Sequence, residues 1–91
     1  MRIITREEIK KKIEEILLDH NWIKQGEVVH ERHSYENDYG MDSLDWIEMI
    51  MDLEKEYSIS IPDDKAERMR TVATTIDYLH RQLNDYGKEQ N

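Results

Sequence analysis

Apolar residues recur every three or four positions in three separate stretches of this 91-residue chain. That spacing places them on one face of an α-helix, whereas a half-buried strand would alternate apolar and polar residues. The first stretch carries Ile9, Ile13, Ile16 and Leu17, and the others lie in residues 42–57 and 72–83. A chain of this length forms one small domain. The sequence therefore predicts an all-α fold in which the helices share one core.

The first helix is expected to begin at Thr5, because Thr5-Arg6-Glu7-Glu8 has the pattern of a capping box, and to fade between Asp19 and Asn21. A connection of roughly residues 20–41 follows, which is longer than most loops in compact domains. We expect its apolar side chains to hold it against the bundle. These are Trp22, Ile23, Val28, Val29, Tyr35 and Tyr39.

A second helix is expected from Asp42-Ser43 to about Tyr57, with Asp42 as its N-cap. At about 100° per residue this helix has two apolar faces. The face expected to meet the core carries Trp46, Met49, Ile50, Leu53 and Tyr57, although the pattern leaves partial exposure of Trp46 open. The second face carries Leu44, Ile47 and Met51 between acidic residues. An exposed apolar strip with a charged rim is typical of a docking site.

The last third of the chain predicts one short and one long helix. Pro62 favours the first turn of a short helix from Asp63 to about Arg68. Thr71 is expected to cap the final helix, whose apolar face carries Val72, Ile76, Leu79 and Leu83. We expect Gly87 to stop this helix, so that residues 1–86 form the domain and 87–91 a disordered polar tail.

The net charge of −8 is concentrated in the middle of the chain, where residues 36–67 carry eleven acids against Lys55 and Lys65. Nucleic acid is excluded as a partner because its phosphates would be repelled. A basic protein surface fits this charge, and a solvated acidic face kept for solubility is the alternative.

Several other functions find little support. There is no cysteine, and no apolar run is long enough to span a membrane. No secretory signal is visible at the start, so a cytoplasmic protein is expected. His30-Glu31-Arg32-His33 is one residue short of the zinc motif, and alignment of Gly40 with a calcium loop puts aromatic residues at ligand positions. We therefore expect no metal site.

The segment Tyr39-Gly40-Met41-Asp42-Ser43-Leu44-Asp45 resembles the acyl carrier protein signature, a Gly-x-Asp-Ser-Leu at the start of the second helix. A second block matches in register, with Ile61-Pro62-Asp63-Asp64-Lys65-Ala66-Glu67 followed by Thr71-Val72 and Ile76-Asp77-Tyr78-Leu79. Upstream, residues 23–28 resemble the loop that follows the first helix in this family. The resemblance covers roughly residues 5–83.

The resemblance implies a four-helix bundle with three main helices, one short helix and a long first loop. It implies that a transferase using Mg²⁺ moves 4′-phosphopantetheine from coenzyme A to Ser43, and that the monomeric protein delivers acyl groups in fatty-acid, polyketide or related synthesis without catalysing a reaction itself. The matching positions imply docking to basic patches of transferases and synthases by six residues of the second helix. These are Asp42, Leu44, Asp45, Ile47, Glu48 and Met51.

The chain also departs from the family pattern. Tyr35 stands where a phenylalanine is typical, and Thr74 and Thr75 stand where alanines are common, near the cleft that receives acyl chains in the family. We hypothesise a smaller or more polar cleft suited to short or polar acyl groups; the alternative is ordinary drift with hydroxyls bonding back to the helix. An aminoacyl or peptidyl carrier, an unmodified interaction module and, more remotely, a hydrolase using Ser43 remain alternatives.

Overall fold

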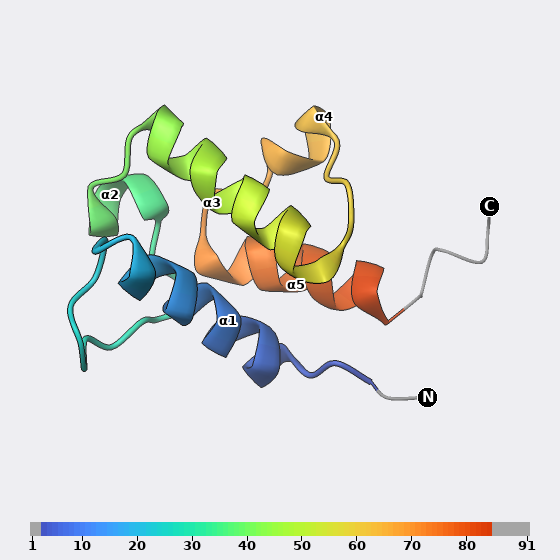
Figure 1. The fold of residues 1–91 in the computed structure, drawn as a ribbon, viewed down its shortest axis with the longest axis horizontal. Helices are drawn as coiled ribbons and strands as arrows, with labels where there is room; N and C mark the ends of the chain where they lie inside the picture. Colours follow the sequence, from blue (N-terminus) through green and yellow to red (C-terminus); the bar gives the residue numbers. More distant parts are fainter. Residues whose placement is uncertain (1–2, 85–91) are drawn as a thin grey trace.

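The computed structural model describes residues 3–84, and this part of the chain folds into five helices (Figure 1). They are α1 Arg6–Asp19, α2 Tyr35–Tyr39, α3 Ser43–Tyr57, α4 Asp63–Ala66 and α5 Val72–Leu83. The long helices α1, α3 and α5 pack side by side, and α4 belongs to the connection from α3 to α5, drawn above α3 in Figure 1. The predicted all-α bundle is confirmed, with one more short helix than expected.

The three long helices begin where the sequence predicts. Thr5, Asp42 and Thr71 are N-caps, and each forms a full capping box with the residue three positions on. In each box the cap side chain accepts a hydrogen bond from a backbone N–H that would otherwise lack a partner. The short helix ends at Ala66 rather than near Arg68, because Glu67 already serves as its C-cap. The predicted stop at Gly87 and the polar tail lie outside the described residues.

The core is a single apolar cluster to which every long helix contributes. Ile9, Ile13 and Leu17 of α1 are fully buried and meet the buried faces of α3 and α5. Burial of each large side chain stabilises the fold by about 1.5–3 kcal/mol. The buried residues of the other two helices are Trp46, Met49, Ile50, Leu53, Val72, Thr75, Ile76 and Leu79. Trp46, whose exposure the sequence left open, belongs to the core.

The connection from α1 to α3 is more ordered than a plain loop. It contains α2, which begins at the N-cap Ser34 and ends at Gly40 in the left-handed conformation (φ 65°). Sequence periodicity could not reveal a helix of five residues with only one buried side chain, Tyr35. Ile23 and Val29 are buried as expected, and Trp22 and Tyr39 are half-buried. The expectation for Val28 was wrong, since it is exposed and cannot hold the loop down.

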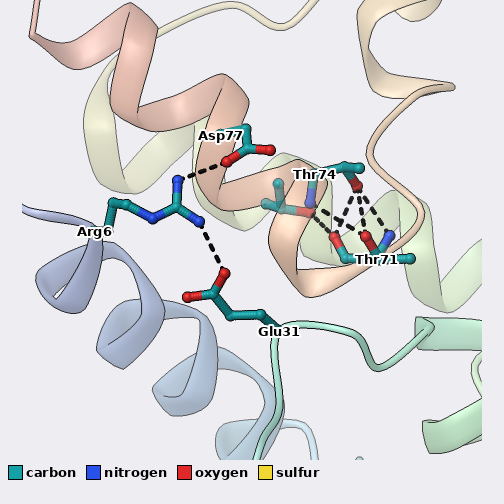
Figure 2. Close-up of polar contacts among 6 residues, drawn as sticks. Arg6, Glu31, Thr71, Thr74 and Asp77 are labelled. Carbon is teal, nitrogen blue, oxygen red and sulfur yellow. Dashed lines mark hydrogen bonds and ion pairs between the residues drawn. The ribbon is translucent and has the colours of Figure 1, made fainter.

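This connection completes the start of α5. The backbone N–H groups of Val72 and Ala73 donate to the carbonyls of His33 (3.0 Å) and Glu31 (2.7 Å). The first N–H groups of a helix have no acceptor within the helix, and here the loop carbonyls supply the acceptors that a preceding helical turn would provide. Arg6 reinforces the junction, because its guanidinium joins the carboxylates of Glu31 (2.9 Å) and Asp77 (2.6 Å), as Figure 2 shows. The first loop is therefore a fixed part of the bundle.

The two ends of the described chain meet at one end of the molecule. The backbone N–H of Ile4 donates to the Asn84 side-chain oxygen, and the Asn84 amide donates back to the Ile4 carbonyl, both at 2.8 Å. The beginning of α3 lies at the opposite end of the bundle (Figure 1). The ends of the described residues and the Asp-Ser-Leu segment are thus far apart.

Candidate functional site at the start of α3

Ser43 is the first residue of α3 and its side chain is exposed. The residues before it fix its position, since Gly40 turns the chain in the left-handed conformation and Met41 is buried, with its N–H bonded to the Tyr35 carbonyl at 3.1 Å. A residue with a side chain would be strained at φ 65°, which explains the glycine. Met41 thus anchors the chain in the core, and Ser43 is held outward two residues later.

The capping box of α3 surrounds the serine. The Asp42 carboxylate accepts from the Asp45 N–H at 2.9 Å, and the Asp45 carboxylate accepts from the Asp42 N–H at 3.1 Å. Within residues 3–84, neither the Ser43 hydroxyl nor the N–H groups of Ser43 and Leu44 form a hydrogen bond. The serine hydroxyl therefore lies at the positive end of a helix dipole, a position favourable to a phosphate group.

The Ser43 hydroxyl is not hydrogen-bonded to a general base within the described residues. A nucleophilic serine is activated by a general base at hydrogen-bond distance, and this hydroxyl forms no hydrogen bond to a histidine, lysine or carboxylate there. His33 lies instead against Tyr39, with its Nδ1 2.7 Å from the tyrosine oxygen, and His30 meets the His33 ring edge-on. In this part of the chain no three potential ligand residues gather to hold a metal ion. The exposed serine is suited to being modified by another protein.

A groove of about 400 Å³ opens beside Ser43. Its walls come from α2, the start of α3 and the connection before α5, and its floor includes the buried side chains of Tyr35, Met41 and Trp46. Polar groups of Glu36, Asn37 and other residues line the rest. The full lining is Ser34, Tyr35, Glu36, Asn37, Met41, Asp42, Ser43, Trp46 and Arg70. Sequence analysis did not place Arg70 or Asn37 here, because both reach the groove through the fold alone.

Two hydrogen bonds fix the floor of this groove. The Tyr35 hydroxyl donates to the Thr75 hydroxyl at 2.7 Å, and the Trp46 indole N–H donates to the Met69 carbonyl at 3.0 Å. A tyrosine hydroxyl is protonated at neutral pH, and burial raises the pKa of Tyr35 further, so the hydroxyl is a donor there and stays one in alkaline solution. The Arg70 guanidinium lies 4.0 Å from the centre of the Trp46 ring. The floor is therefore apolar in composition but held by specific polar contacts.

The two threonines noted in the sequence have different environments. Thr74 is exposed and belongs to the capping box of Thr71, as Figure 2 shows. Thr75 is fully buried, and its hydroxyl donates to the Thr71 carbonyl at 2.8 Å while it accepts from Tyr35. Both hydroxyls bond back to the helix as the alternative interpretation requires. Thr75 also makes a bond across the core, which drift alone does not predict.

The outer face of α3 carries the apolar strip predicted from the helical plot. Leu44, Ile47 and Met51 are exposed, Leu44 at 73% and Met51 at 57%, while the opposite face of α3 is buried. Asp42 and Glu48 are exposed beside the strip and Asp45 is half-buried by its capping bonds. Five of the six residues of the predicted docking set are therefore exposed, and Asp45 is half-buried.

His20 of the α1 C-cap lies beside the acidic residues Glu48 and Asp52 of α3, a contact that the sequence did not reveal. Its Nε2 lies 2.6 Å from an Asp52 oxygen and its Nδ1 lies 3.9 Å from a Glu48 oxygen. The ring also stacks on Trp22, with centroids 4.3 Å apart. The histidine at the C-cap of α1 therefore contacts Asp52 directly and lies near Glu48, so α1 contributes a basic side chain beside the acids of α3. No helix of the described chain is long and apolar enough to cross a membrane.

Comparison with known proteins agrees with this geometry. Residues 4–79 match the family model described as the phosphopantetheine attachment site. The chain is 42% identical over 76 residues to acyl carrier proteins from two strains of Porphyromonas gingivalis, an alignment that covers 84% of this chain and 96% of each relative. It is 43% identical over 74 residues to the acyl carrier protein of Rubrobacter xylanophilus, covering 81% and 90% respectively. The chain belongs to the phosphopantetheine-bearing acyl carrier proteins.

Proposed function

We propose that Ser43 is the residue to which 4′-phosphopantetheine is attached. The single observation that carries this proposal is an exposed hydroxyl without a protein partner at the N-terminus of α3, in the Asp-Ser-Leu segment of a carrier fold. In the transfer, the Ser43 oxygen forms a bond to the phosphorus of coenzyme A next to pantetheine. The pyrophosphate P–O bond breaks, adenosine 3′,5′-bisphosphate leaves, and the hydroxyl proton passes to the transferase or solvent.

The attached arm supplies the thiol that this cysteine-free chain lacks, and acyl groups are held on it as thioesters. The residues of the protein present and orient the arm. The N–H groups at the start of α3 favour the phosphodiester charge, and Asp42 and Asp45 fix the helix terminus that bears it. The chain is a carrier, so we propose that it performs no chemical step itself and acts as a monomeric domain of residues 1–86.

We propose that the docking surface is the strip of Leu44, Ile47 and Met51 with the acids Asp42, Asp45 and Glu48. Their exposure supports this role, because a monomer has no structural reason to expose three large apolar side chains in one row. The negative rim favours partners with basic patches, and opposite charges increase association rates and orient the encounter. The phosphopantetheinyl transferase and acyl-transferring synthases are the partners expected.

The test is to incubate the protein with coenzyme A, Mg²⁺ and a transferase of broad specificity and to measure its mass. We expect a gain of one phosphopantetheine group in the wild type, no gain in Ser43→Ala, and an unchanged gain in Ser60→Ala, since Ser60 is an exposed serine beyond the other end of α3. Absence of a gain in the wild type would favour an unmodified interaction module. Ester hydrolysis that disappears in Ser43→Ala would favour an enzyme.

A further inference from the structure

The groove beside Ser43 ends on a floor that is fixed from two sides. Tyr35 joins α2 to α5 through Thr75, and Trp46 joins α3 to the connection before α5 through the Met69 carbonyl. An apolar group delivered at Ser43 can enter the core by this route only if one of these two side chains moves. Movement of Tyr35 leaves its hydroxyl without a partner in an apolar core, and movement of Trp46 does the same to the Met69 carbonyl. Such losses are unfavourable.

The walls of the groove differ from its floor. Asn37 has a free side-chain amide in the part of the chain that the structure describes, and the Arg70 guanidinium binds Glu67 at 2.9 Å through one nitrogen only. Arg70 also lies over the Trp46 ring, and the Trp46 indole N–H joins α3 to the connection before α5. These donors match acyl groups that carry hydroxyl or oxo oxygens, whereas the carboxylates of Glu36 and Asp42 in the same lining disfavour an acyl carboxylate. A saturated chain would gain little against such walls.

We infer that this carrier keeps long saturated acyl chains out of its core, because the Tyr35–Thr75 hydrogen bond holds the floor of the groove closed. The inference rests on the proposed attachment at Ser43 and adds the substrate class. It assigns Tyr35 and Thr75 as residues that determine acyl selectivity, although neither contacts the reacting thioester.

The decisive variant is Tyr35→Phe/Thr75→Val, which removes both hydroxyls and preserves the shape of both side chains. Replacement of both partners of a buried hydrogen bond by apolar groups is nearly neutral for stability, so the variant is expected to fold. Tyr78→Phe is the control, because it removes a half-buried tyrosine hydroxyl whose one hydrogen-bond partner among residues 3–84 is Gln82, also in α5. Circular dichroism checks that all proteins have the same helix content.

Each protein is loaded with butyryl or decanoyl phosphopantetheine, its mass is verified, and the rate of thioester cleavage by hydroxylamine is measured. In the wild type and the control we expect the two thioesters to react within about twofold of each other. In the double variant we expect the decanoyl thioester to be protected by about tenfold, since one buried hydrogen bond no longer opposes entry. Protection of the decanoyl group in the wild type, or no gain in the double variant, would overturn the inference.

A second measurement keeps this test independent of the transferase. The chain has no cysteine, so Ser43→Cys can be alkylated at one site with a decyl or methyl iodoacetamide carried on a spacer as long as pantetheine. We expect the decyl group to leave the backbone amide resonances of Thr75 and Ile76 unchanged, and to shift them when Tyr35→Phe/Thr75→Val is added. A shift without those substitutions would refute the closed floor. Failure of transferase loading would refute only the attachment at Ser43.

Discussion

Two substitutions of Asp42 can distinguish the effect of the α3 capping box on stability from its effect on docking. Asp42 accepts the Asp45 N–H at 2.9 Å and places a negative charge at the helix N-terminus beside Ser43. Asp42→Ala removes both effects, whereas Asp42→Asn keeps the side-chain oxygen that accepts the bond and removes only the charge. Loss of an N-cap costs about 1 kcal/mol, and loss of the favourable charge adds about 0.3–1 kcal/mol.

We therefore expect Asp42→Ala to lower the free energy of unfolding by about 1–2 kcal/mol and Asp42→Asn by less than about 1 kcal/mol. For a domain of this size the alanine variant should melt about 5–10 °C lower than the wild type. Thermal unfolding followed by circular dichroism measures this directly. Urea unfolding at the same pH gives the free energies, and equal slopes would show that the denatured states are alike.

The rate of loading by the transferase should order these variants differently from their stability. Because Asp42 is part of the proposed docking rim, both variants lose the charge that attracts a basic partner, and both should load more slowly at low salt. The difference from the wild type should shrink as the salt concentration rises. Equal destabilisation by Asp42→Asn and Asp42→Ala would refute the capping argument. Unchanged loading of both variants would remove Asp42 from the docking surface.

Three further outcomes are expected. Burial raises the pKa of Tyr35 above its unfolded value near 10, so the neutral hydroxyl contributes fully to stability below pH 10. Above pH 10 the free energy of unfolding should fall by up to about 1.4 kcal/mol per pH unit. Urea unfolding at pH 9 and pH 11 should therefore show a smaller loss of stability between the two pH values in Tyr35→Phe than in the wild type. Arg6→Gln breaks two partly exposed ion pairs and should cost about 0.5–1.5 kcal/mol at low salt, less in 1 M NaCl. Met51→Glu should leave the melting temperature nearly unchanged and slow transferase loading, and a lower melting temperature would place Met51 in the core instead.

The features that the sequence predicted correctly depend on short-range patterns. The starts of α1, α3 and α5 follow from cap residues and their partners three positions on, and the two faces of α3 follow from a period of 3.6 residues. The exposed strip from Leu44 to Met51 was predictable for the same reason. These patterns act within one or two helical turns, so a single sequence contains them in full.

The features that the sequence did not predict depend on contacts between distant residues. Tyr35 and Thr75 are 40 positions apart, and Trp46 and Met69 are 23 apart. Each residue taken alone suggested only a departure from the family pattern or an ambiguous face of a helix. The short helix α2 was missed because it gains its order from the carbonyls and N–H groups that it shares with the start of α5, and not from apolar periodicity.

The pairing of Ile4 with Asn84 has a practical consequence. Ile4 and Asn84, near the two ends of the described residues, lie together and remote from the beginning of α3 (Figure 1). We therefore expect an affinity tag, a fluorescent fusion or a surface linker joined next to either of them to leave the N-terminus of α3 accessible to a partner enzyme. Immobilisation by the C-terminal side should preserve modification, whereas a tether placed on α2 would obstruct it.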